Sequence, residues 1–139
     1  MQLAILSVLI ACLFPSSIFC QADSKPDPEA RLWLDIKHAL TEPDGRYYFD
    51  TSLKNSLIPT LHGTLVSSTP ADHPNILLLA MPGSKIAEVT LKLAGRMTSP
   101  PQPGTMIKFD GVAEAFVKQP FMLTFEVQGA PRAVAPKDK

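Results

Sequence analysis

The clearest pattern in the chain is an alternation of apolar and polar side chains in its last third. From Phe121 to Val127, a large apolar residue occupies every second position, and Thr124 and Glu126 lie among the residues between them. A period of two is typical of a β-strand with one face buried and the other in water. The pattern therefore predicts a core strand over 121–127.

Four further segments carry strand patterns, and clusters of Pro, Gly and small polar residues separate them. Gly63 and Gly111 lie inside two of these segments, where a glycine indicates a β-bulge or a close approach of backbone; at Gly111 we expect a bulge that bends the strand. In the third segment the alternation places Glu88 on the water-facing side. The four predicted strands are Leu61–Ser68, Ile76–Met81, Ala87–Leu93 and Met106–Phe116.

A helix is predicted nearer the N-terminus, over Pro28–Leu40. Asp27 has the side chain of an N-cap, proline follows at the first helical position, and apolar residues recur at helical spacing. Trp33 could stack on a ligand, but its place on this apolar stripe favours packing against the strands.

Residues 41–60 are ambiguous, because Tyr47–Phe49 has strand character whereas Leu53–Ile58 could form a helical turn. Five strands and one helix, with no alternation of helix and strand, predict a mainly β fold. We expect a five-stranded OB-like Greek-key barrel with a short N-terminal helix. The expected divisions of the chain are a signal peptide (1–22), a helix and irregular lead-in (23–60), the barrel (61–128) and a disordered tail (129–139).

The first 22 residues have the character of a secretory signal peptide. Leu3–Phe14 is an almost unbroken apolar run, ended by a Pro-Ser-Ser sequence. Small residues at Cys20 and Ala22 favour cleavage before Asp23. The expected location is therefore periplasmic or secreted, with no membrane insertion after cleavage.

Two alternatives would instead tether the chain to a membrane. Leu9–Cys12 resembles a lipoprotein signal box, in which Cys12 would carry lipid, and the N-terminal segment could also remain uncleaved as an anchor. Cys12 and Cys20 are the two cysteines of the chain. Cleavage before Asp23 would leave a mature protein with no disulfide and no thiolate ligand.

Charge argues against nucleic acid as a partner. The chain has 13 basic and 13 acidic residues, with no long run of either sign. Binding of nucleic acid needs a basic patch, and single-stranded substrates also need exposed aromatic side chains for stacking. The apolar alternation instead predicts Phe109, Phe121 and Phe125 in the core.

Several segments resemble a module found at the C-terminus of exported bacterial proteins of acidobacterial type, often behind tetratricopeptide repeats. They are LKNSLIPTLHGTLVSSTP (53–70), AEVTLKL (87–93), PGTMIKFDGVAEAF (103–116) and QPFMLTFEV (119–127). The resemblance implies an OB-like envelope domain of uncharacterised role, and it brings no catalytic residues. No repeat array is predicted here, since the one helix is shorter than half of a 34-residue repeat.

The chain offers little catalytic or metal-binding chemistry by sequence. Its histidines, His38, His62 and His73, form no spaced metal motif, and Asp72-His73 is more typical of a solvated turn than of a metal site. No serine lies in a nucleophile elbow. We therefore predict no catalytic residue, no cofactor and no metal.

Three functions remain open. The preferred one is a non-enzymatic binding or interaction domain of the bacterial envelope. It would bind an unknown peptide, glycan or envelope protein at a barrel end or in a groove beside Arg46, Tyr47, Tyr48 and Phe49. The second is a stress-protective periplasmic barrel that captures small cationic or amphipathic ligands. The third, and least favoured, is a small hydrolase using the carboxylates Asp110, Glu114 and Glu126.

Overall fold

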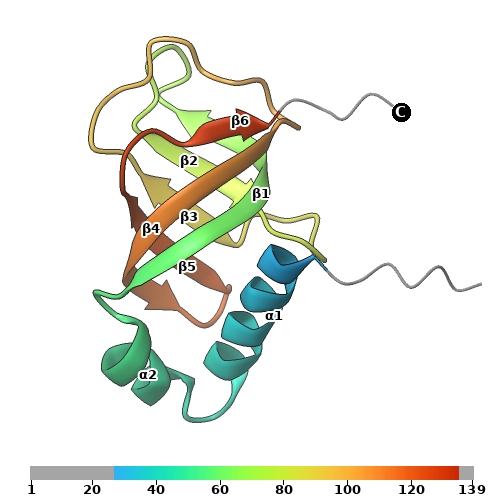
Figure 1. Cartoon of the computed structure of the whole chain (residues 1–139), viewed down its shortest axis with the longest axis vertical. Coiled ribbons are helices and arrows are strands. Elements are labelled where there is room, and N and C mark those ends of the chain that lie inside the picture. Colours follow the sequence, from blue (N-terminus) through green and yellow to red (C-terminus); the bar gives the residue numbers. More distant parts are fainter. Residues whose placement is uncertain (1–26, 135–139) are drawn as a thin grey trace, which may run out of the picture.

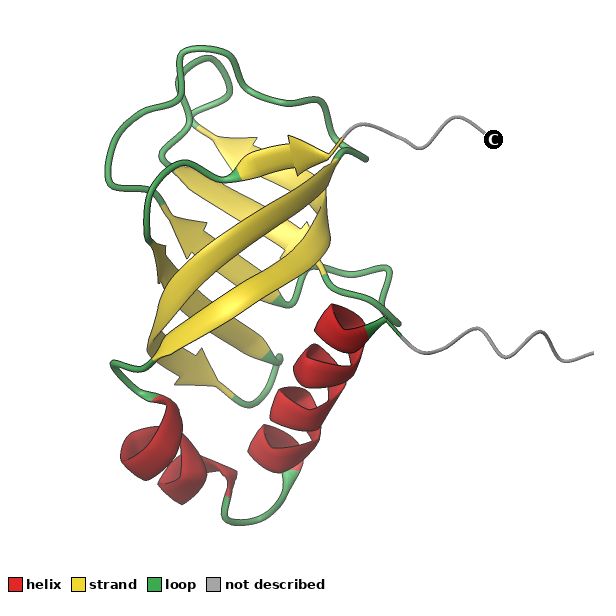
Figure 2. Cartoon of the chain, in the orientation of Figure 1, coloured by secondary structure: helices red, strands yellow, loops and turns green. Residues whose placement is uncertain are grey.

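The structure, a computed structural model, describes residues 27–134, which form a β-barrel with a helix packed against it (Figure 1). Helices make up the N-terminal part of this region, and strands joined by loops make up the remainder (Figure 2). The predicted signal peptide and its alternatives lie outside the described residues. The strands are β1 (Leu57–Thr69), β2 (Ile76–Ala80), β3 (Val89–Lys92), β4 (Met106–Val117), β5 (Met122–Val127) and β6 (Arg132–Val134).

The barrel closes because β1 pairs with both β2 and β4. Around the barrel the order is β1-β2-β3-β5-β4, and the pairing of β4 with β1 completes the ring. All of these pairings are antiparallel except β3 with β5, which are parallel. The predicted five-stranded OB-like Greek-key barrel is thereby confirmed.

Alternating side chains fill the barrel interior, as the sequence pattern predicted. Along β5, Leu123, Phe125 and Val127 are buried, whereas Glu126 is exposed. The Phe125 ring packs against Phe109 of β4, with ring centroids 5.4 Å apart. These large side chains form the centre of one continuous hydrophobic core.

The glycines inside the strands allow close packing and do not mark bulges. A Cβ on Gly111 would lie 2.9 Å from the Cβ of Phe125, and one on Gly63 would lie 2.7 Å from the Sδ of Met81. The bulge expected at Gly111 is therefore wrong: in β4 the register shifts between Ala113 and Ala115. Gly111 is needed because a large aromatic ring lies directly against its backbone.

One helix, α1 (Pro28–Thr41), closes one end of the barrel (Figure 1). The Asp27 side chain accepts a hydrogen bond from the backbone N–H of Glu29 and caps the helix, as predicted. Trp33 is fully buried in the core and meets the Phe121 ring edge-on, with centroids 6.0 Å apart. Trp33 is therefore a packing residue, as its helical stripe indicated.

Glu88 is the main exception to the predicted alternation. It was expected to face water, but it is 5% exposed, and its carboxylate accepts a hydrogen bond from the ammonium of Lys37 on α1. The Lys37 ammonium also lies 5.6 Å from the centre of the Phe121 ring. Docking of α1 over the start of β3 removes this carboxylate from water and supplies the cation that it then requires.

The ambiguous segment between α1 and β1 is helical. It forms α2 (Gly45–Tyr48) and a π-helical turn, η1 (Phe49–Leu53), so the strand character of Tyr47–Phe49 misleads. Phe49 and Leu53 are buried in the core. Tertiary packing of these two side chains outweighs the local preference for an extended backbone.

Element boundaries also differ from the sequence prediction, most of all at the start of β1 and in the expected tail. β1 begins at Leu57, which is four positions earlier than predicted. Part of the expected disordered tail forms β6, which pairs antiparallel with residues 106–108 of β4. A short segment that pairs without a buried face leaves no hydrophobic signal in the sequence. Residues 135–139 lie outside the described part of the chain.

Truncation of the buried face of β5 should be severely destabilising. We predict that Leu123→Ala and Phe125→Ala each lower the free energy of unfolding by ~3–5 kcal/mol, because each leaves a cavity in a closed core. Val117→Ala, at an exposed position, should change it by less than ~0.5 kcal/mol. Urea unfolding followed by circular dichroism measures all three, and losses below ~1 kcal/mol at both core positions would contradict the assignment of faces.

Removal of the Lys37 ammonium should leave the buried Glu88 carboxylate without its cation. We expect Lys37→Met to lower the free energy of unfolding by ~2–4 kcal/mol at pH 7, and the double variant Lys37→Met/Glu88→Leu to recover much of this loss. Lys85→Met, at an exposed position, is the matched control. A loss as small as that of the control would show that α1 does not depend on this pair.

Candidate functional site

The predicted binding residues Arg46, Tyr47, Tyr48 and Phe49 divide into different environments. Tyr47 is 71% exposed, Tyr48 is partly buried against the core, and Phe49 is buried. The guanidinium of Arg46 donates a hydrogen bond from Nη1 to the backbone carbonyl of Phe116 at 3.2 Å. These four residues therefore do not form one groove, but Arg46 and Phe49 share a pocket.

This pocket, which we call the 46–116 pocket, has a volume of about 250 Å³. It lies between the α2–η1 segment and the C-terminal half of β4. Two buried rings, Phe49 and Phe116, lie 5.7 Å apart between centroids and line its apolar part. Its lining residues are Arg46, Phe49, Asp50, Lys54, Glu114, Ala115 and Phe116.

Charges of both signs line the 46–116 pocket. Arg46 and Lys54 contribute cations, and Asp50 and Glu114 contribute carboxylates. One carboxylate oxygen of Glu114 accepts a hydrogen bond from Lys92 at 2.9 Å, while the other, Oε2, is shielded from solvent and has no hydrogen-bond partner among the described residues. The pocket therefore presents both cations and carboxylates to a ligand.

Two of the three carboxylates predicted for a hydrolase have partners on the barrel. Asp110 accepts a hydrogen bond from Thr60 Oγ1 at 2.9 Å, and Glu114 pairs with Lys92. Within residues 27–134, Asp110, Glu114 and Glu126 do not form a group whose oxygens all lie within 4.8 Å of one another. Catalytic carboxylate pairs of glycoside hydrolases lie about 5–9.5 Å apart, so the hydrolase hypothesis stays a prediction.

A second pocket, of about 450 Å³, lies at the opposite end of the barrel from α1. It is formed by the first part of the β3–β4 connection, residues 93–99, and by residues 129–131 before β6. Met97 from this connection packs against the core, and its N–H donates to the carbonyl of Pro74. Arg96 is the charged residue of its lining.

Folding also gathers three potential metal ligands that are separated in the sequence. Asp27 and Glu29 at the start of α1 lie beside His62 of β1, and one ligand atom from each lies within 4.8 Å of the others. His38 and His73 are exposed elsewhere, the former 3.2 Å from the carboxylate of Glu42. A sequence motif could not reveal the cluster, because His62 is 33 positions from Glu29 and the two meet only when α1 docks.

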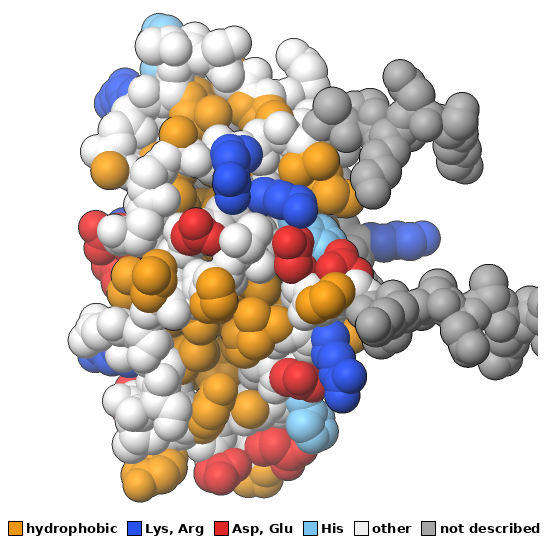
Figure 3. All heavy atoms as spheres, viewed as in Figure 1, with side chains coloured by type: hydrophobic (Ala, Val, Ile, Leu, Met, Phe, Trp, Pro, Cys, Tyr) orange, Lys and Arg blue, Asp and Glu red, His pale blue; other side chains and the backbone are white. Residues whose placement is uncertain are grey.

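The surface and the helices give two further observations. Acidic and basic side chains are interspersed on the face shown in Figure 3, and apolar side chains gather between them. Within residues 27–134, no helix is long and apolar enough to span a bilayer.

A scan of the chain against protein-family models finds no match, and searches of curated proteins and of solved structures also find none. The fold alone defines the class of the domain, an OB-like barrel closed by an N-terminal helix.

The ion pair between Lys92 and Glu114, at the wall of the 46–116 pocket, predicts how Lys92 titrates. Hydrogen bonding to Glu114, together with the charges of Glu114 and Glu126, raises the pKa of Lys92 above its usual 10.5. The pair therefore contributes all of its stabilisation below the usual lysine pKa and loses it as the pH rises through the raised value.

We expect the Nζ resonance of Lys92 to titrate at a higher pH in the wild-type protein than in Glu114→Gln, measured by NMR. The exposed Lys85 serves as an internal reference. Identical Lys92 titration in the two proteins would show that the pair does not form in solution.

Proposed function

We propose that the chain is an exported, non-enzymatic binding domain of the bacterial envelope, and that the 46–116 pocket holds its ligand. Export rests on the apolar N-terminal segment of the sequence. Binding rests on the pocket, which joins two of the predicted binding residues, Arg46 and Phe49, to charged residues of η1 and β4.

The observation that carries the proposal is the combination of fixed charges with an apolar base. The hydrogen bond from Arg46 to the Phe116 carbonyl holds the guanidinium at the pocket wall, and the aromatic rings below are locked in the core. Polar groups fixed by the scaffold give a binding site its orientation and specificity. Because β4 is a wall of the barrel, this pocket is built on a rigid element.

The charges favour a peptide among the candidate ligands. A ligand with one amino group and one carboxylate can meet Glu114 and Asp50 with the first and Arg46 and Lys54 with the second. A neutral glycan would leave these charges without a counterpart. The volume of about 250 Å³ lies just below the usual range for drug-sized ligands, so the pocket suits one or two residues of a peptide.

Capture of a small cationic ligand is the second candidate. The carboxylates of Asp50 and Glu114 favour it, since they are anionic partners for an ammonium group. The two candidates differ in their dependence on the basic side chains of the pocket. A purely cationic ligand should bind more tightly when Arg46 is neutralised, whereas a peptide should bind less tightly.

Ligand titrations followed by NMR test both candidates. The protein, purified from the periplasm of a Gram-negative host, is titrated with short peptides that have free termini, with polyamines and with neutral oligosaccharides. We expect peptides to shift the backbone resonances of residues 46–54 and 114–116, and Arg46→Gln to weaken binding about tenfold, in line with the loss of one charge-assisted hydrogen bond.

Lys85→Gln, which removes an exposed cation between β2 and β3, should leave affinity unchanged. Tighter binding of polyamines in Arg46→Gln would support the second candidate instead. If no ligand perturbs the pocket resonances, the pocket is not the binding site.

A further inference from the structure

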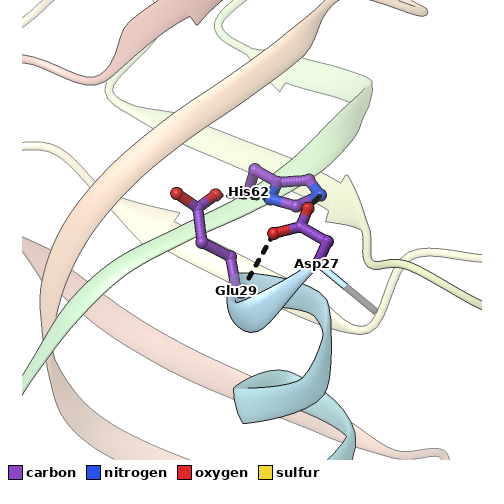
Figure 4. Close-up of side chains that lie close together, drawn as sticks. All are labelled: Asp27, Glu29 and His62. Carbon is purple, nitrogen blue, oxygen red and sulfur yellow. Dashed lines mark hydrogen bonds and ion pairs between the residues drawn. The ribbon is translucent and has the colours of Figure 1, made fainter. Parts of the chain in front are cut away.

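The cluster of Asp27, Glu29 and His62 is held in place by contacts on both sides of the imidazole ring (Figure 4). Nδ1 of His62 lies 2.6 Å from Oε2 of Glu29, and Nε2 lies 3.4 Å from Oδ2 of Asp27. The His62 side chain is only 11% exposed. The ring therefore has one orientation, with each nitrogen directed at a different carboxylate.

Each member of the cluster is positioned by the fold itself. Oδ1 of Asp27 is occupied by the helix cap, 3.1 Å from the N–H of Glu29, which directs its other oxygen toward His62. Glu29 is fixed by a second contact, since its Oε1 lies 3.3 Å from Nζ of Lys108. His62 and Lys108 are paired residues of neighbouring strands, so the barrel wall holds both.

The two contacts of the imidazole differ in kind. The short contact with Glu29 is a strong hydrogen bond. At 3.4 Å the contact with Asp27 exceeds the normal range of about 2.7–3.2 Å for an N–H···O hydrogen bond. Two ligand atoms about 2.0–2.1 Å from one zinc ion, at a tetrahedral angle, lie about 3.4 Å apart.

We propose that this cluster is a binding site for a divalent transition-metal ion such as Zn²⁺, with Nε2 of His62 and Oδ2 of Asp27 as its protein ligands. Glu29 accepts the hydrogen bond from Nδ1–H and orients the ring, as carboxylates beside metal-bound histidines commonly do. Water completes the coordination. With two protein ligands, the ion is exchangeable.

The charges around the cluster are compatible with a bound cation. The carboxylates of Asp27 and Glu29 contribute two negative charges, and Lys108 contributes one positive charge, so the pocket around a neutral His62 remains negative. Lys108 contacts the Glu29 oxygen that does not face the ring, which leaves the proposed ion position open. Lys108 nevertheless reduces the attraction of the site for a cation, and this effect can be measured.

A bound ion would fasten the start of α1 to β1. Asp27 precedes the first turn of the helix, while His62 lies within a strand of the closed barrel. An ion that joins them binds only the folded state, so it raises the melting temperature by mass action. The alternative is an ion-pair clamp, in which His62 and Lys108 hold the two carboxylates without any metal.

Calorimetric titration with ZnCl₂ distinguishes these two roles. It uses the chelator-treated protein that begins at Asp23, which lacks the zinc-binding thiols of Cys12 and Cys20. We expect one ion per chain, loss of binding in His62→Gln, and binding weakened at least tenfold in Asp27→Asn, which keeps a good helix cap. Glu29→Gln should weaken binding 10–100-fold, as expected for a partner that orients the ligand. Lys108→Gln should tighten it, because a neighbouring cation is removed.

His38→Gln is the matched control, since His38 also lies near a carboxylate, that of Glu42, but is exposed on α1. It should leave the stoichiometry and affinity unchanged. A readout that needs no variant is the ¹⁵N spectrum of the His62 ring, in which zinc should shift Nε2 and leave Nδ1 protonated. Absence of this shift at saturating zinc would overturn the metal site and establish the clamp. So would a Lys108→Gln variant whose stability falls and whose zinc affinity does not rise.

Discussion

The closure of the barrel by α1 is the constraint on which the other features depend. A five-stranded barrel has a core that is open at its ends, and here Trp33 enters one end and is completely buried. Covering this end also removes a carboxylate, Glu88, from water. A buried carboxylate is tolerated when a cation accompanies it, and Lys37 on the same helix provides that cation. The docking of α1 and the ion pair between Lys37 and Glu88 therefore depend on each other.

Both proposed binding sites arise from the way the N-terminal segment packs on the barrel. The 46–116 pocket lies where α2 and η1 meet β4, and the Asp27–Glu29–His62 cluster lies where the start of α1 meets β1. The barrel supplies the rigid side of each site, and the N-terminal segment supplies most of its charge. Weakening the contact between the segment and the barrel would therefore alter both sites.

The barrel was predictable from sequence because its signal is local. Along β5, alternate large apolar residues predict a strand and its buried face together, and the cap at Asp27 marks the start of α1. Features that depend on long-range packing were not predictable. Glu88 is polar in an alternating pattern and so was predicted to face water, and Phe49 is buried by tertiary contacts in a helical turn despite its strand propensity.

The candidate sites were likewise predictable from the sequence only where their residues are neighbours along the chain. Arg46 and Phe49 were predicted as part of a groove at residues 46–49, and both line the 46–116 pocket, but Tyr47 and Tyr48 do not. The charged partners Lys54 and Glu114 come from segments 60 positions apart, so no local pattern could join them. His62 was likewise an isolated histidine in the sequence, and its carboxylate neighbours become visible only when α1 is placed on the barrel.

Native-state hydrogen exchange tests the central claim most directly, because it measures the opening free energy of each backbone amide. If α1 closes the barrel, the amides near Trp33 and Ile36 should open with the same free energy as those of Leu123 and Phe125 in β5. They should also lose protection together with β5 when Lys37 is replaced by Met. Exchange of the α1 amides at a much lower free energy than β5 would contradict the account, since it would show a barrel that is stable without its helix.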